Sequence, residues 1–222
     1  MHLTTHAARS TRAYVAETLR EAIITGELKP GQQLRQDQLS AEFVASAAPV
    51  REALRQLESE GLVVHFSNRG SFVAEITERE LREVLLPLRL HLERYALDRA
   101  TESGHERLCD QLDEVVAEMD FAAKHGDLRA VTEADVRFHR TLVDAAGSTQ
   151  TSQIWGSIQW RLRVQFHRLG DPAQRLHRIT DEHATLLKVI RGGETESVHA
   201  ALEEHIVLAA EKLLNAYSGT ER

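Results

Sequence analysis

The sequence predicts a mainly α protein with an N-terminal winged helix-turn-helix (three helices plus a β-hairpin) and a C-terminal all-α antiparallel helical bundle. Three observations lead to this fold class. Four prolines and twelve glycines are few for 222 residues, and the composition favours helix. Two short apolar runs flank a turn sequence near Asn68. From Thr77 onward, helical periodicity continues and no convincing strand is found.

The N-terminal part is predicted to begin with a flexible arm at residues 1–12. From Tyr14, apolar residues recur at helical spacing until "TGELKPG", which contains strong turn signals. A second short helix is predicted at 34–43. The third helix begins near Ser46, which can cap it, and ends at Gly61.

The segment "LVVHFSNRGSFVAEI" follows the third helix and predicts two strands around "SNRG". We therefore assign a winged helix-turn-helix to residues 13–76. Thr77 and Glu80 have the spacing of a capping box, which marks the start of a second domain at 77–222. Short connections between its helices favour antiparallel neighbours. These helices are predicted at 78–101, 104–124, 128–146, 150–169, 172–191 and 195–217.

The overall composition excludes several classes of protein. Contents of 42% hydrophobic and 27% charged residues are ordinary for a globular chain and argue against wholesale disorder. No apolar run approaches the roughly 20 residues that span a bilayer, and the N-terminus lacks an apolar segment of signal-peptide type. With Cys109 as the single cysteine, no internal disulfide can form. We therefore expect a cytoplasmic protein without a membrane partner.

The charge pattern permits contact with DNA although the chain is acidic overall. The net charge is −7, but the first 76 residues carry only −1 of it. Arg51 and Arg55 lie one turn apart near the start of the third helix, where a recognition helix touches DNA. Arg69 at the hairpin tip is placed to enter a minor groove. The alternative is a surface helix with solvated arginines.

A second group of residues has the chemistry of metal ligands. Asp135 and His139 are four residues apart on one predicted helix face, and His183 and His205 flank the Gly192–Gly193 turn. One carboxylate and three imidazoles suit a first-row divalent ion and leave coordination positions open. By spacing alone, an ordinary helix-surface or core pair remains the alternative.

The segments "LREAIITGELKPGQQL", "PVREALRQLESEGLV" and "NRGSFV" closely resemble the DNA-binding domain of the GntR family of bacterial transcription regulators. With an all-helical C-terminal part, the chain resembles the FadR subfamily, whose effector domain is called FCD. Ala47 and Ala48 depart from the family's usual "SRTPVREAL", so the resemblance leaves the typical half-site contacts open. The DNA-contacting residues that the resemblance implies are Arg35, Ser46, Arg51, Arg55, Arg69 and Gly70.

The resemblance also implies a metal site and an effector. FCD domains carry an Asp and a His four apart and two later histidines, and this chain has the full set, Asp135, His139, His183 and His205. Zinc is the expected ion, with nickel, manganese or iron as alternatives that ligand type does not separate. Arg89, and less clearly Arg163, would hold a carboxylate effector. The alternative for Arg89 is a surface pair with Glu93.

Together these features predict a ligand-responsive transcription regulator, expected to be a repressor, that senses a small organic acid. Its partners would be double-stranded operator DNA, a small carboxylate and a second copy of the chain in a homodimer. One alternative makes the metal itself the signal, and another makes the metal purely structural. The remaining alternative, a helical metalloenzyme, leaves the N-terminal domain unexplained, so we expect no enzymatic activity.

Overall fold

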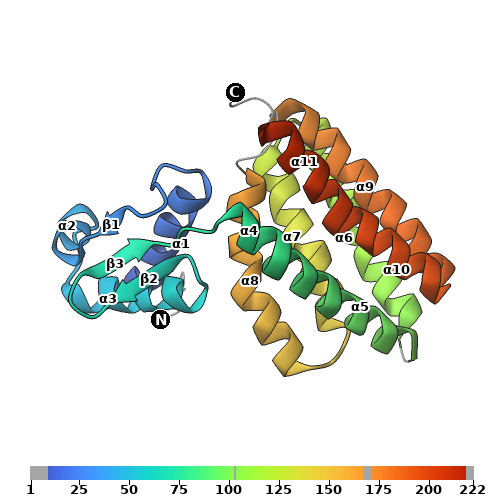
Figure 1. Cartoon of the computed structure of the whole chain (residues 1–222), viewed down its shortest axis with the longest axis horizontal. Helices are drawn as coiled ribbons and strands as arrows, with labels where there is room; N and C mark the ends of the chain where they lie inside the picture. Colours follow the sequence, from blue (N-terminus) through green and yellow to red (C-terminus); the bar gives the residue numbers. More distant parts are fainter. Residues whose placement is uncertain (1–9, 103, 168–171, 219–222) are drawn as a thin grey trace, which may run out of the picture. The chain divides into compact units, whose positions relative to one another are not determined.

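The structure is a computed structural model that describes residues 10–102, 104–167 and 172–218. The chain divides between Ile76 and Thr77 into two compact units, an N-terminal one with a small sheet and a C-terminal one made of helices (Figure 1). This is the predicted fold class. Within the described ranges, no helix has the length and apolar character needed to cross a bilayer.

The N-terminal unit contains three helices, α1 (Thr11–Ile24), α2 (Gln36–Glu42) and α3 (Ala47–Ser59). The predicted arm at 1–12 is too long at its end, because the Ser10 side chain accepts a hydrogen bond from the Ala13 backbone and starts α1 there. Residues 1–9 of that arm lie outside the described residues.

The sheet has one strand that the sequence did not reveal. β2 (Val63–Phe66) and β3 (Gly70–Val73) form the predicted hairpin, and β1 (Gln33–Leu34) pairs antiparallel with the other edge of β3. The predicted helix at 34–43 is therefore wrong at its start, and α2 begins at Gln36. Two residues are too few to display strand alternation, and their partners come from a distant part of the chain.

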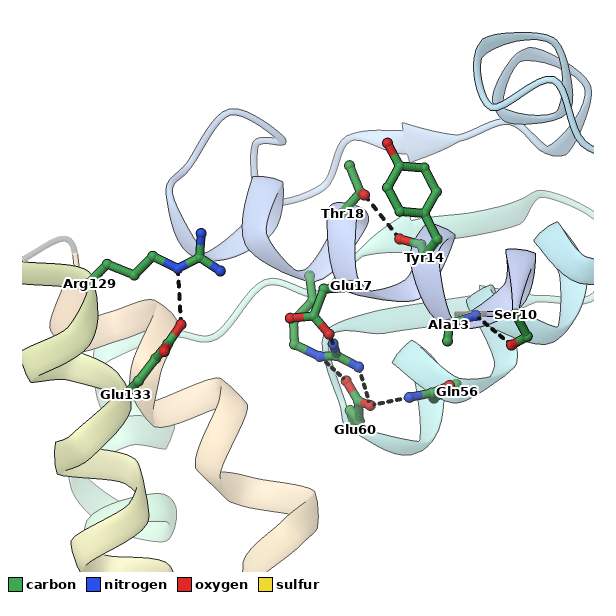
Figure 2. A network of polar contacts seen from close by, with 10 residues as sticks. Ser10, Ala13, Tyr14, Glu17, Thr18, Gln56, Glu60, Arg129 and Glu133 are labelled. Carbon is green, nitrogen blue, oxygen red and sulfur yellow. Dashed lines mark hydrogen bonds and ion pairs between the residues drawn. The ribbon is translucent and has the colours of Figure 1, made fainter. Parts of the chain in front are cut away.

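Helix α3 is held by an apolar face and by a largely buried ion pair at its C-terminal end. Val50 and Leu57 are fully buried, and α3 packs against α1. Arg20 of α1 is only 8% exposed and donates two hydrogen bonds, of 2.8 and 2.7 Å, to the Glu60 carboxylate just after α3. Figure 2 shows Glu17 and Gln56 on either side of this pair. The bidentate contact fixes the C-terminal end of α3 relative to α1.

Val44, in the turn between α2 and α3, has an unfavourable backbone conformation. Its φ is 49°, a value that a β-branched residue rarely adopts. A left-handed conformation costs an L-residue roughly 1–2 kcal/mol, whereas glycine adopts it freely but loses more entropy on folding. We expect Val44→Gly to raise the free energy of unfolding by about 0.5–1 kcal/mol, measured by urea denaturation of the full chain.

Val64 provides the matched control for this prediction. It is an exposed valine of the same unit and lies in strand β2, where glycine weakens the strand. Val64→Gly should therefore lower the free energy of unfolding. A loss of stability in Val44→Gly as well would show that its backbone conformation is not strained.

The C-terminal unit, in the described residues, consists of helices. The predicted capping box is confirmed: Thr77 accepts from the Glu80 backbone at 3.1 Å, and Thr77 N–H donates to the Glu80 carboxylate at 2.9 Å. The long helices are α5 (Leu86–Glu102), α6 (His105–Lys124), α7 (Leu128–Asp144), α8 (Thr149–His167) and α9 (Pro172–Gly192). Positions 168–169 of the predicted fourth helix lie outside the described residues.

The first and last predicted helices of this unit each contain a π-helical turn. The first is made of α4 (Glu78–Glu80), η1 (Leu81–Leu85) and α5. The last is made of α10 (Thr195–Glu203), η2 (Glu204–Leu208) and α11 (Ala209–Ser218). Such turns are rare in proteins, and those that occur often lie at functional sites. The one in η2 carries His205, a predicted metal ligand.

Helix α7 occupies the centre of the unit. It packs against α5, α6, α8 and α9, and Figure 1 shows it among these helices. Phe138 and Leu142 of α7 are fully buried. A polar side chain on this face of α7 is therefore removed from water and must find its partners on the surrounding helices.

Candidate metal centre and nucleic-acid interface

The four predicted metal ligands meet inside the C-terminal unit. Nε2 of His139 on α7 lies 3.2 Å from Nε2 of His183 on α9 and 3.2 Å from Nε2 of His205 in η2. Oδ1 of Asp135 lies 3.0 Å from His183 Nε2 and 3.8 Å from His139 Nε2. Two nitrogens bound to a common zinc ion at 2.0–2.1 Å are roughly 3–3.5 Å apart, so this spacing suits metal ligands.

The hydrogen bonds of the two buried imidazoles determine which nitrogen carries the proton. His139 Nδ1 lies 2.9 Å from the Glu93 carboxylate, and His183 Nδ1 lies 2.7 Å from the Ile179 carbonyl. Both partners are acceptors, so each Nδ1 is protonated and the two Nε2 atoms face one another. These two nitrogens and the Asp135 carboxylate, 3.0 Å from His183 Nε2, converge on one position that a shared cation can occupy. Metal-bound histidines commonly have this second hydrogen bond.

The electrostatic environment keeps the cluster ready for a cation. Burial lowers the pKa of His139 below its ordinary value, and the Arg89 guanidinium adds to this effect. Burial and the neighbouring imidazoles hold the pKa of His205 well below its ordinary value. Burial alone would raise the pKa of Asp135, but His183, His139 and Arg89 outweigh it and lower that pKa. These directions favour the neutral form of His139 and His205 and the ionised form of Asp135.

Glu93 has a role that the sequence did not reveal. Its carboxylate is fully buried, and its two oxygens contact His139 Nδ1 and Arg89 Nε, each at 2.9 Å. Arg89 is only 6% exposed, so the alternative of a surface Arg89–Glu93 pair is wrong. Although burial alone would raise the pKa of Glu93, His139 and Arg89 lower it. The R-x-x-x-E spacing on a core-facing helix was the only signal in the sequence.

A cavity of about 110 Å³ adjoins the metal ligands. Because a water molecule needs roughly 10–15 Å³ of such space, the cavity has room for more than an ion and one water. The indole N–H of Trp155 is buried and has no hydrogen-bond partner among the described residues. Besides the metal ligands, the residues that line the cavity include Arg89, Thr132, Trp155, Gln159, Arg163 and Glu182.

The two residues predicted to bind the effector therefore both line this cavity. The Arg89 guanidinium lies 5.5 Å from the Trp155 ring, and Arg163 lies 5.7 Å from the Trp160 ring. These contacts orient both guanidinium groups. Arg89 already donates Nε–H to Glu93, so its terminal nitrogens remain for a second anion.

In the N-terminal unit, the predicted DNA-contacting arginines are accessible. Arg51 and Arg55 are exposed on the same face of α3. Arg55 pairs with Glu52 at 3.0 Å, whereas Arg51 has no ion pair within the described part of the chain. Arg51 is therefore the more available of the two for a phosphate or a guanine edge.

The other predicted DNA contacts lie at the start of α2, at the start of α3 and in the hairpin. Arg35 is exposed and 3.3 Å from Asp37. Ser46 occupies the predicted N-cap position of α3, but its side chain makes no capping hydrogen bond and stays exposed. Arg69 is exposed at the hairpin tip, and Gly70 follows it with a φ of 87° that suits glycine.

A winged helix-turn-helix with exposed arginines, joined to a helical unit with a polar cavity, defines a transcription regulator. Residues 11–73 match the bacterial regulatory proteins of the gntR family, and residues 84–208 match the FCD domain. The chain belongs to the GntR family and carries an FCD domain. It is a DNA-binding regulator and not an enzyme.

Proteins similar to this chain are regulators of the same kind. The gluconate operon transcriptional repressor of Bacillus licheniformis is 28% identical over 88% of this chain and 82% of its own length. A probable D-xylose utilization operon transcriptional repressor of Paenarthrobacter nicotinovorans is 26% identical over 89% of this chain and 88% of its own length. The crystal structure of a GntR transcriptional regulator from Rhodococcus sp. RHA1 has a TM-score of 0.76 and 27% identity, over 94% of this chain and 99% of that one.

Proposed function

We propose that this regulator is a cytoplasmic homodimeric repressor of the FadR subfamily that senses a small carboxylate through a bound divalent metal. Asp135, His139, His183 and His205 hold the ion, with zinc favoured. The observation that carries the proposal is the convergence of three imidazoles, with Nε2 of His139 and Nε2 of His183 3.2 Å apart and the Asp135 carboxylate beside them. An ion held by these residues would supply a Lewis acid to anchor the carboxylate effector.

The charge around the cavity supports an anionic effector. A divalent ion with Asp135 and three neutral imidazoles leaves one positive charge, and the Arg89–Glu93 pair adds none. Burial raises the pKa of Glu182, and its charge is offset by Arg178, whose Nε lies 3.7 Å from the carboxylate. The Arg163 side chain also lines the cavity. An organic carboxylate would neutralise this excess and accept hydrogen bonds from arginine.

The relatives suggest which acid to test first. Two of them, from Bacillus licheniformis and Bacillus subtilis, are repressors of gluconate operons. Gluconate is a sugar acid with one carboxylate and several hydroxyl groups. The cavity offers both an arginine and uncharged donors, including the Trp155 indole and the Gln159 amide. We therefore propose a hydroxylated carboxylate as the effector class.

Operator binding in the presence of metal and acid tests this proposal. An operator is first obtained by selection from a random duplex library. Its affinity is then measured with the chelated protein, with zinc alone, and with zinc plus gluconate or another small acid. We expect zinc plus acid to weaken binding by about 5- to 150-fold, corresponding to a coupling of 1–3 kcal/mol. A full response to zinc alone would make the metal the signal, and no response in any arm would contradict sensing at this site.

Arg51→Ala is expected to weaken operator binding by about 1–3 kcal/mol at constant salt concentration. Arg51 is exposed near the start of α3 and has no competing ion pair in the described residues, so its loss does not disturb the fold. The control is Lys188→Ala, which removes the same charge from an exposed position on α9 of the other unit. If both variants bind the operator like the parent chain, α3 does not contact DNA through Arg51.

A further inference from the structure

The first turn of α3 presents methyl groups where a recognition helix meets base edges. Ala47 and Ala48 are exposed and occupy the first two positions of the helix. Ala47 lies four residues before Arg51, and Ala48 lies seven before Arg55, so the two alanines extend the arginine face toward the helix start. The buried face carries Val50 and Leu54. Ala48 lies in line with Arg55, away from that face, whereas Ala47 lies at its border, seven residues before Leu54, and is still exposed. Both alanines are therefore accessible beside the arginine face.

Val44 adds a third apolar group directly ahead of this turn. Its side chain is 93% exposed, the most of any large apolar side chain among the described residues. Its φ of 49° is costly for a β-branched residue, and glycine at this position would remove the cost. An exposed apolar side chain kept at a strained position contributes nothing to the core, and such strain is typical of functional sites.

These side chains can recognise only one kind of group in the major groove. Alanine and valine side chains neither donate nor accept hydrogen bonds. The apolar group that a base pair presents there is the C5-methyl of thymine. We propose that Val44, Ala47 and Ala48 determine operator specificity by packing on thymine methyl groups, next to the bases or phosphates contacted by Arg51. The proposal rests on DNA recognition by α3.

Replacement of thymine by deoxyuridine removes only this methyl group and gives a direct test. The operator selected from a random duplex library is resynthesised with deoxyuridine at one thymine of each half-site at a time. We expect at least one position where the substitution weakens binding about 3- to 10-fold, as the loss of one buried methyl predicts. Equal affinity for thymine and deoxyuridine duplexes at every position would overturn the proposal.

The ratio of the affinity for the thymine duplex to the affinity for the deoxyuridine duplex identifies the residues that contact the methyl group. Partial unfolding of a variant lowers both affinities equally and leaves this ratio unchanged. In Ala47→Gly and Ala48→Gly the ratio should fall toward one for the thymine that each alanine contacts. Ala41→Gly changes an exposed alanine of α2 and should keep the parent ratio. Ala47→Ser and Ala48→Ser repeat the test with a residue that favours helix starts. A parent ratio in every variant would overturn the assignment.

Val44→Gly separates this role from stability. The variant is expected to be more stable than the parent chain, yet to lose discrimination at the thymine that Val44 contacts. Arg51→Ala should weaken binding to thymine and deoxyuridine duplexes alike and leave their ratio unchanged. If the library yields no selected sequence, recognition by α3 fails and the thymine assignment fails with it. If an operator is found but its thymine methyls are not sensed, only the thymine assignment fails.

Discussion

Glu93→Ala should lower the free energy of unfolding of the helical unit by about 3–5 kcal/mol, the loss expected when one partner of a buried ion pair is removed. The Glu93 carboxylate is fully buried and accepts from Arg89 and His139 at 2.9 Å each. Its removal leaves the Arg89 charge in the core without its partner and the His139 Nδ1–H without an acceptor. Urea denaturation of the chelated full-length protein measures this loss.

Glu83→Ala is the matched control for this variant. Glu83 forms the same i, i+4 ion pair, with Arg79 at 2.9 Å, but both side chains are exposed. Its loss should cost less than about 0.5 kcal/mol. Metal affinity separates the two variants further, since loss of the hydrogen-bond partner of a ligand weakens binding about 10- to 100-fold. Similar small changes in both variants would show that Glu93 does not support the site.

His139→Ala should abolish stable metal binding. Nε2 of His139 lies 3.2 Å from Nε2 of both other imidazoles, so His139 is the central ligand of the cluster. We expect the affinity to fall by more than the 100-fold upper range for a supporting residue. Metal content per chain after dialysis measures this directly. In the parent chain, zinc at 1,000 times its dissociation constant should add about 4 kcal/mol to stability, and the variant should gain little.

The control for this experiment is another histidine of the same unit. His199 of α10 bonds to Asp98 at 2.8 Å and is not among the clustered imidazoles. His199→Ala should retain the metal and the zinc-dependent gain in stability. Full metal content in both His139→Ala and His205→Ala would refute the proposed ligand set.

The parts of the protein that were predicted best are those specified by local sequence. The helices, the hairpin and the Thr77–Glu80 capping box depend on residues a few positions apart, so periodicity and turn chemistry were sufficient. The β1 strand was missed because its pairing with β3 is long-range. The π-helical turn at His205 was missed because a single wider turn shifts the apolar pattern by only about one residue within a long helix.

The sequence predicted which residues form the candidate metal site, but not which residues support them. The four ligand types and their order were recognised from the sequence and from the family resemblance. The contact between Glu93 and His139 spans 46 positions and joins two helices, so neither helix alone indicates it. The hypothesis of a surface ion pair between Arg89 and Glu93 was left open, because i, i+4 spacing does not indicate which face of a helix is buried.

By itself the sequence determined which segments are helical, where the two domains divide, and which side chains could contact DNA or a cation. It did so because helix periodicity, capping and turn residues act over one or two turns of chain. Only the tertiary structure decided that α7, α9 and η2 bring three imidazoles within 4.8 Å, and that Glu93 supports one of them from α5. Those distances depend on how helices pack, and packing is set by the sum of many side-chain contacts across the core.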